Sequence, residues 1–187
     1  MPDARATAVT NTNPNSCVNV QTARLCKPWQ ISSAGREFIE AWEQFRPHMY
    51  DNDGAGGGGN TTIGYGHLVH QGPISGAPSE APFLNGITQA QGHQLMQHDL
   101  IDPQRIVNQR INVPLFQYKY DALVDFVYNL RHHNEGLLNL VNTGHYDRVP
   151  AKFMDYTSAG GAHPAGLVKR RRAEANLFKE GNYDASH

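Results

Sequence analysis

One stretch of the chain decides its fold: residues 43–67 read EQFRPHMYDNDGAGGGGNTTIGYGH. Two short segments with strand character, Met49–Asp53 and Asn60–Tyr65, lie on either side of a glycine-rich run, and this pattern is typical of a hairpin around a loop. Glu43 lies on the last turn of a preceding segment whose apolar residues recur at helical spacing. The stretch therefore predicts a helix that leads directly into a small β-containing region.

Outside this stretch the sequence predicts mostly helices. Ser33 is the expected cap of the first helix, which should end before Pro47. Thr88 and Gln91 form a capping box that opens a helix with a break or kink at Pro103. Further helices are expected over Tyr120–Leu130, Leu137–Val141, Val149–Tyr156 and Ala165–Lys179, with a long loop between the hairpin and Asn85.

This order of elements predicts an α+β fold with two lobes. The small β-containing lobe should cover about residues 48–85. The larger helical lobe should cover about residues 88–181 together with the first helix, residues 33–46, and a long helix should join the two. The folded domain is expected over residues 31–187.

Residues 1–30 are polar and turn-prone, and we expect them to be a leader or a linker from a longer polypeptide. They hold both cysteines of the chain, Cys17 and Cys26. A disulfide between these cysteines in an oxidising compartment and two free thiols in a reducing one are equally compatible with the sequence. Neither cysteine has a close Cys or His partner, so a four-ligand zinc site is not expected.

Composition narrows the functional class. The 187 residues carry 16 Lys and Arg against 17 Asp and Glu, a net charge of −1. A protein that binds nucleic acid by neutralising phosphates needs a basic surplus, so no nucleic acid partner is expected. Apolar runs are only a few residues long, and we therefore expect neither membrane insertion nor a signal peptide. The composition is typical of a soluble globular protein, here expected to be a monomer.

The residues around the hairpin have the chemistry of a glycoside hydrolase. Glu43 lies beside an apolar face, where a partly desolvated carboxylic acid suits general acid catalysis. Asp51 and Asp53 lie two residues apart on a strand and its turn, so both could face the same cleft as Glu43. Thr62 supplies a hydroxyl that can hold a water. Glu40 has a similar local sequence, but no such residues are expected to assemble around it.

The spacing of these residues resembles the phage-type lysozymes of glycoside hydrolase family 24. The resemblance rests on Glu43, on Tyr50 and on the hexapeptide TIGYGH at residues 62–67. It covers about residues 31–178. It continues through ITQAQ (87–91), VPL (113–115), YDALV (120–124), FVYN (126–129) and GLVKRR (166–171).

The resemblance implies a lysozyme-like fold and a muramidase that needs no cofactor. Its substrate would be peptidoglycan, cut with inversion at the β-1,4 bond between N-acetylmuramic acid and N-acetylglucosamine. Glu43 matches the family's catalytic acid and Thr62 its catalytic threonine. The family's aspartate follows Tyr by two residues, which is Asn52 here. We therefore expect Asp53 to be the catalytic aspartate, with Asp51 as the alternative.

Five further residues receive roles from the same resemblance. His67 would form a structural ion pair with Asp99. Arg170 would approach the catalytic glutamate, unless it belongs to a solvated basic face of its helix. Asn129 would hydrogen-bond the sugar amides, unless it is an ordinary buried or capping residue, and Tyr65 would also contact the substrate.

Two alternatives come from other functional classes. One is a catalytically silent peptidoglycan-binding module with the same fold. The other is a metal-dependent wall amidase that uses His67, His70 and His98, although the metalloprotease motif HExxH is absent. A muramidase made in the cytoplasm would act in the bacterial cell wall or periplasm. It would be either a phage endolysin or a secreted antibacterial effector, and the effector would have an immunity protein as partner.

Overall fold

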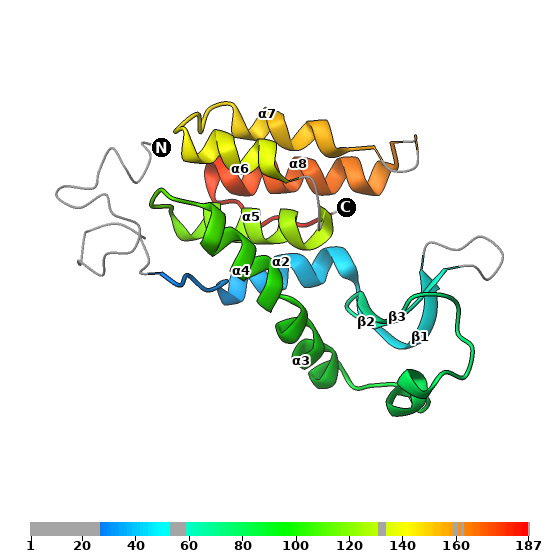
Figure 1. The fold of residues 1–187 in the computed structure, drawn as a ribbon. Coiled ribbons are helices and arrows are strands. Elements are labelled where there is room, and N and C mark those ends of the chain that lie inside the picture. Colours follow the sequence, from blue (N-terminus) through cyan, green and yellow to red (C-terminus); the bar gives the residue numbers. More distant parts are fainter. Residues whose placement is uncertain (1–26, 53–58, 131–133, 159–160, 162, 187) are drawn as a thin grey trace. The chain divides into compact units, whose positions relative to one another are not determined.

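The computed structural model describes residues 27–52, 59–130, 134–158, 161 and 163–186. The predicted catalytic Asp53 and both cysteines lie outside these residues. Figure 1 labels the elements along the chain. The chain divides into two compact units, which are described separately. The β unit is Glu40–Ile101, and the helical unit combines the chain up to Ile39 with Asp102–His187. None of the helices in the described part has both the length and the apolar character that crossing a bilayer requires.

The β unit contains an antiparallel sheet with the strand order β1-β2-β3. Strand β1 is Arg46–Asn52, β2 is Asn60–Gly64 and β3 is His67–His70. The first two strands confirm the predicted hairpin. Pro47 is tolerated in β1 because this strand lies at the sheet edge, where a missing N–H costs no ladder hydrogen bond.

Strand β3 corrects the sequence prediction, which placed a loop there. All four of its residues are half-buried, so the strand lacks the alternation of buried and exposed residues that reveals a strand in a sequence. It follows β2 through a turn in which Gly64 and Gly66 have φ values of 66° and 77°. Residues with a Cβ rarely adopt this left-handed backbone, which explains the glycines on both sides of Tyr65.

The remainder of the β unit is a loop and one helix. A short 3-10 helix, η1 (Pro78–Phe83), lies within the loop that follows β3. Helix α3 (Gln89–Asp99) begins with the predicted capping box, because the Thr88 side chain accepts a hydrogen bond from the Gln91 amide and Gln91 bonds back to Thr88. Helix α3 packs against β2.

The expected long connecting helix is two helices. Helix α3 ends at Asp99 and α4 (Ile101–Arg110) begins two residues later, so the break lies at Leu100 rather than at Pro103. Proline has no N–H, and its ring clashes with the carbonyl four residues earlier, which here belongs to Asp99. Pro103 therefore stops the hydrogen-bond ladder ahead of itself and lies in the first turn of α4, where its missing N–H is not needed.

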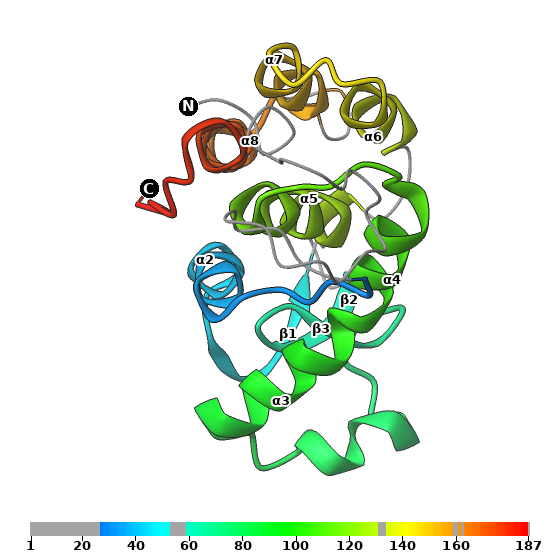
Figure 2. The same cartoon turned by 90° about the vertical axis from the view of Figure 1, so that its left-hand side faces the viewer.

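The helical unit is built around α5 (Gln117–Leu130), in which every residue from 119 to 128 is buried. Helix α8 (Ala165–Glu180) packs on α5, and α7 (Val149–Phe153) packs on α8, as Figure 2 shows. Helix α6 (Glu135–Asn142) and the 3-10 helix η2 (Met154–Tyr156) complete the helices after α5. The described residues thus form seven α-helices and three strands, which confirms the α+β class.

A buried carboxylate ties the first helix to α5. Asp121 is 1% exposed and accepts hydrogen bonds from the Ser32 amide at 3.1 Å, the Ser32 hydroxyl at 2.5 Å and the Tyr183 hydroxyl at 2.7 Å. The Ser32 oxygen in turn accepts the Gly35 amide at 3.0 Å. Ser32, and not Ser33 as predicted, therefore caps α2 (Ser33–Glu43).

Gly35 allows α2 to approach Asp121 closely, and this predicts the effect of a methyl group. A Cβ at Gly35 would lie 2.6 Å from Cγ of Asp121 and 2.8 Å from Cγ1 of Ile31. We expect Gly35→Ala to lower the free energy of unfolding by about 1–3 kcal/mol, because overpacking outweighs the better helix propensity of alanine. Urea unfolding followed by circular dichroism measures the difference.

Gly166→Ala is the matched control for this prediction. Gly166 is also helical, and a Cβ there meets no atom of the described chain within 4 Å. This substitution should raise the free energy of unfolding by about 0.5–1 kcal/mol. Equal changes in the free energy of unfolding at the two glycines would mean that a methyl group at position 35 does not clash with Asp121.

Candidate active site

Glu43 is the last residue of α2 and is half-buried. The next residue, Gln44, has a φ of 55°, and its amide donates to the Glu40 carbonyl at 3.0 Å. A left-handed residue that closes the last turn is a common way to end a helix, although glycine usually occupies it. The chain then enters β1, so Glu43 lies at the junction of helix and hairpin.

The end of α2 is attached to α3 through Glu40, one turn before Glu43. The Glu40 carboxylate accepts a hydrogen bond from Nδ1 of His93 at 2.7 Å. The His93 ring stacks on Tyr65, with ring centroids 5.2 Å apart. The expectation that nothing assembles around Glu40 is therefore wrong. Its partner lies 53 residues away in sequence, so local composition could not reveal it.

Tyr65 is 5% exposed, and its hydroxyl accepts a hydrogen bond from the Gln89 side chain at 3.0 Å. Its ring also lies 5.3 Å from that of Phe45. These contacts give Tyr65 a packing role in the β unit. Contact with substrate stays a prediction for this residue.

Thr62 lies in the centre of β2 and is 2% exposed. Its hydroxyl donates to the Asn60 carbonyl at 3.0 Å. A hydroxyl has one donor and two acceptor positions, so the Thr62 oxygen retains acceptor capacity for a water. Tyr50 is the cross-strand partner of Thr62, and the two side chains therefore share one face of the sheet.

Asp51 lies on the other face. Its cross-strand partner is Thr61, and side chains alternate between faces along a strand, so the Asp51 carboxylate points away from the face of Thr62. It accepts the Ile74 amide at 2.9 Å. Strand β1 ends at Asn52, and Asp53 follows outside the described residues. Of the two predicted aspartates, Asp51 thus has a separate hydrogen-bonding role.

The three histidines of the predicted metal alternative contact two carboxylates, and these belong to Asp99 and Glu80. Nδ1 of His67 lies 2.8 Å from Oδ2 of Asp99, so the structure brings this predicted pair together. His98 lies 3.6 Å from the same aspartate, whereas His70 contacts Glu80 at 2.8 Å. Among the described residues, no group of three or more His, Cys, Asp or Glu side chains is arranged to hold a metal ion.

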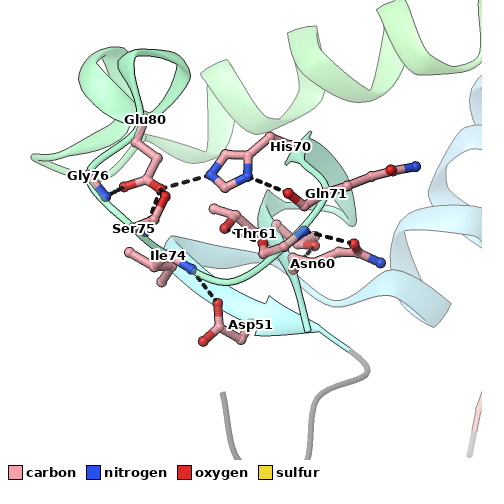
Figure 3. Close-up of polar contacts among 11 residues, drawn as sticks. Asp51, Asn60, Thr61, His70, Gln71, Ile74, Ser75, Gly76 and Glu80 are labelled. Carbon is pink, nitrogen blue, oxygen red and sulfur yellow. Dashed lines mark hydrogen bonds and ion pairs between the residues drawn. The ribbon is translucent and has the colours of Figure 1, made fainter. Parts of the chain in front are cut away.

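Glu80 is a residue that the sequence prediction missed. It is 1% exposed and accepts the amides of Ser75 at 2.8 Å and Gly76 at 3.0 Å, in addition to His70 (Figure 3). The Ser75 amide and the His70 side chain lower the pKa of Glu80 to about 2. A signal was present, since Glu80 is the only charged residue between positions 71 and 86.

The hydrogen bonds of His70 favour its charged form. Its hydrogen bond to the Gln71 carbonyl and its bond to Glu80 raise the pKa of His70. The imidazolium and the carboxylate therefore form an ion pair over a wider pH range than isolated groups would. This pair lies at the end of β3, where the long loop begins.

In the helical unit, Arg170 and Asn129 belong to a buried group of polar side chains. Nη2 of Arg170 lies 2.5 Å from Oδ1 of Asp125. Arg171 is fully buried and donates to both carboxylate oxygens of Glu174 and to Oδ1 of Asn129. A solvated basic face is therefore wrong for Arg170. We call Arg170, Arg171, Asp125 and Glu174 the charge cluster. The predicted roles of Asn129 and Arg170 toward substrate and catalytic acid stay predictions.

The chain is similar in sequence to several phage endolysins. The chain is 33% identical over 156 residues to the endolysin of Acyrthosiphon pisum secondary endosymbiont phage 1, which covers 80% of this chain and 97% of that endolysin. The endolysins of Bacillus phages B103 and PZA are longer, and the chain spans 54% and 56% of their lengths.

Two solved structures share the fold. The muramidase domain of SpmX from Asticaccaulis excentricus matches with a TM-score of 0.65 at 29% identity, covering 80% of this chain and 97% of that domain. The endolysin from Escherichia coli O157:H7 phage FAHEc1 matches with a TM-score of 0.70 at 25% identity, covering 83% and 97%. The family model described as phage lysozyme matches residues 40–174, a range that includes Glu43, Thr62 and the whole hairpin. The chain therefore belongs to the phage lysozyme family.

Proposed function

We propose that this protein is a muramidase that hydrolyses peptidoglycan at the β-1,4 bond between N-acetylmuramic acid and N-acetylglucosamine. The observation that carries the proposal is the junction of α2 and the hairpin. It places Glu43 at the end of a helix and Thr62 in a buried strand of the same unit, within the segment that matches the phage lysozyme family. The endolysin relatives and the solved muramidase domain support the same activity.

In the proposed reaction, Glu43 in its acid form donates its proton to the glycosidic oxygen of the leaving sugar as the C1–O bond breaks. A water attacks C1 from the opposite face, and its proton passes to the Asp53 carboxylate. The Thr62 oxygen accepts a hydrogen bond from this water and orients it, because the hydroxyl hydrogen is already directed at the Asn60 carbonyl. Asp53 also stabilises the positive charge that develops on the sugar ring.

The stereochemical outcome follows from the place of the water. When a water attacks directly from the face opposite the leaving group, the anomeric configuration inverts, whereas a covalent intermediate would retain it. A threonine that holds a water beside the aspartate suits the direct route. We therefore propose inversion.

The biological role follows from the relatives. An endolysin acts on the bacterial cell wall, and the similarity to phage endolysins favours that role over a secreted effector with an immunity protein. We propose that the protein acts on the wall as a monomer, because each of the proposed catalytic groups comes from the same chain.

The acid role of Glu43 predicts a large loss of activity in Glu43→Gln. The amide keeps the shape of the side chain but cannot donate an acidic proton, so kcat should fall by about 10²–10⁴-fold. Release of reducing sugar from purified peptidoglycan measures this loss. Glu37→Gln is the matched control, since Glu37 lies on the same helix and is exposed. Activity near wild type in Glu43→Gln would reject the mechanism.

The base role of Asp53 predicts a comparable loss in Asp53→Asn, because the amide cannot accept the proton of the attacking water. The free energy of unfolding should change little, because the side chains of aspartate and asparagine have nearly the same size and shape. The anomer first released from a soluble wall fragment, followed by proton NMR, should be inverted in the wild type. Release of the retained anomer would contradict direct attack by water and would indicate a covalent intermediate.

A further inference from the structure

The loop after β3 is held on the hairpin by two carboxylates. Glu80 binds the amides of Ser75 and Gly76 and the side chain of His70, which closes the loop on the end of β3 (Figure 3). Asp51, on β1, binds the Ile74 amide at 2.9 Å. Three consecutive amides, 74 to 76, are thus satisfied by carboxylate oxygens. Hydrogen bonds to ionised acceptors are stronger than neutral ones.

Neutral contacts fix the same loop to β2. The Gly72 carbonyl accepts both the amide and the hydroxyl of Thr61, each at 2.9 Å. The Gly72 amide donates to the Asn60 side chain at 3.2 Å. Residues 72–76 therefore contact β1 through Asp51 and β2 through Asn60 and Thr61. We call this set of contacts the loop anchor.

The anchor residues flank the residues that react in the proposed mechanism. Thr61 precedes Thr62, and Asp51 lies two residues before Asp53. Asp51 and Thr61 are cross-strand partners on the face opposite Thr62. The loop anchor therefore contacts β1 and β2 on the face opposite Thr62, at the residues next to the Tyr50–Thr62 pair.

We propose that Asp51 and Glu80 are positioning residues for the hydrolysis, which fix the backbone of β1 and β2 so that Thr62 holds the attacking water in line. This inference rests on the proposed function. It assigns Asp51 to the anchor and not to the reaction. Glu80 is buried, and its hydrogen bonds offset the cost of burying a carboxylate.

The ionisation of Glu80 agrees with this role. Its pKa is lowered to about 2, so the carboxylate accepts its hydrogen bonds at every pH at which peptidoglycan hydrolysis would be measured. Among the described residues, its hydrogen-bond partners include His70, Ser75 and Gly76.

Two substitutions of Asp51 distinguish a positioning role in the loop anchor from a direct role in the reaction. In Asp51→Asn, the remaining carbonyl oxygen can still accept the Ile74 amide, so kcat should stay within about threefold of wild type. In Asp51→Ala, the acceptor is lost and kcat should fall by about 10- to 100-fold with little change in KM, because displacement of a catalytic group by about 1 Å can cost two orders of magnitude. Glu80→Gln should resemble Asp51→Ala, since one carbonyl oxygen cannot replace two carboxylate oxygens.

Amide hydrogen exchange reports on the anchor without relying on activity. The Ile74 amide should exchange at least about tenfold faster in Asp51→Ala than in the wild type, while buried α5 amides such as that of Val127 keep their protection and show that the variant is folded. Asp102→Asn is the control, because it removes a surface carboxylate that pairs with Arg105 at 3.0 Å. It should change neither kcat nor the Ile74 exchange rate.

Three results would overturn the inference. Equal loss of kcat in Asp51→Asn and Asp51→Ala would make Asp51 a reacting carboxylate. Unchanged Ile74 exchange in Asp51→Ala would mean that the anchor does not depend on this residue. Faster exchange with wild-type kcat would mean that the anchor is only structural. Failure of the proposed function would appear differently, as full activity in Glu43→Gln, which leaves the Ile74 exchange rate unaffected.

Discussion

The cross-strand pairing of Tyr50 with Thr62 is the constraint on which the candidate site depends. Because side chains alternate along a strand, this one pairing decides that Thr62 faces one side of the sheet while Asp51 and Thr61 face the other. A slip of one residue would exchange the two faces, and Thr62 would then share a face with Asp51. The loop after β3 opposes such a slip, because Gly72 hydrogen-bonds with the side chains of Thr61 and Asn60 on β2 while the Ile74 amide donates to Asp51 on β1.

The two units achieve order in different ways. In the helical unit, α5 has an uninterrupted run of buried residues, most of them apolar, and these form the centre of the core. In the β unit, much of the loop between β3 and α3 is exposed and contributes little apolar burial. Hydrogen bonds to Glu80, Asp51 and Thr61 fix the backbone there instead. Local hydrogen bonds therefore hold the loop on the hairpin, whereas the packing of buried side chains holds α5 in place.

The elements that could be predicted from the sequence are those with a local cause. The Thr88 capping box, the helical spacing of α5 and the hairpin each depend on residues close in sequence, and the structure contains all three. The prediction failed where the cause is distant or the pattern is absent. Strand β3 has no alternation, and the cap at Ser32 is stabilised through Asp121, 89 residues away.

The residues of the candidate site likewise include some whose position could be predicted from local sequence and some whose position could not. Glu43 and Thr62 could be proposed from sequence because the motif around them is contiguous. The face on which Asp51 lies could not, because two faces are consistent with its sequence position and only the strand register selects one. The partner of Glu40 was equally inaccessible, since no local pattern links α2 with His93.

The charge cluster of α5 and α8 affects how the stability of the helical unit depends on temperature. Bringing Arg170, Arg171, Asp125 and Glu174 out of water is costly at room temperature, even with their direct contacts. The hydration of charged groups becomes less favourable as temperature rises, whereas their mutual attraction in the interior persists. The cluster therefore contributes relatively more to holding α5 and α8 together in a warm cell than in a cold one. Replacing it by apolar side chains would change the temperature dependence of stability as well as its size.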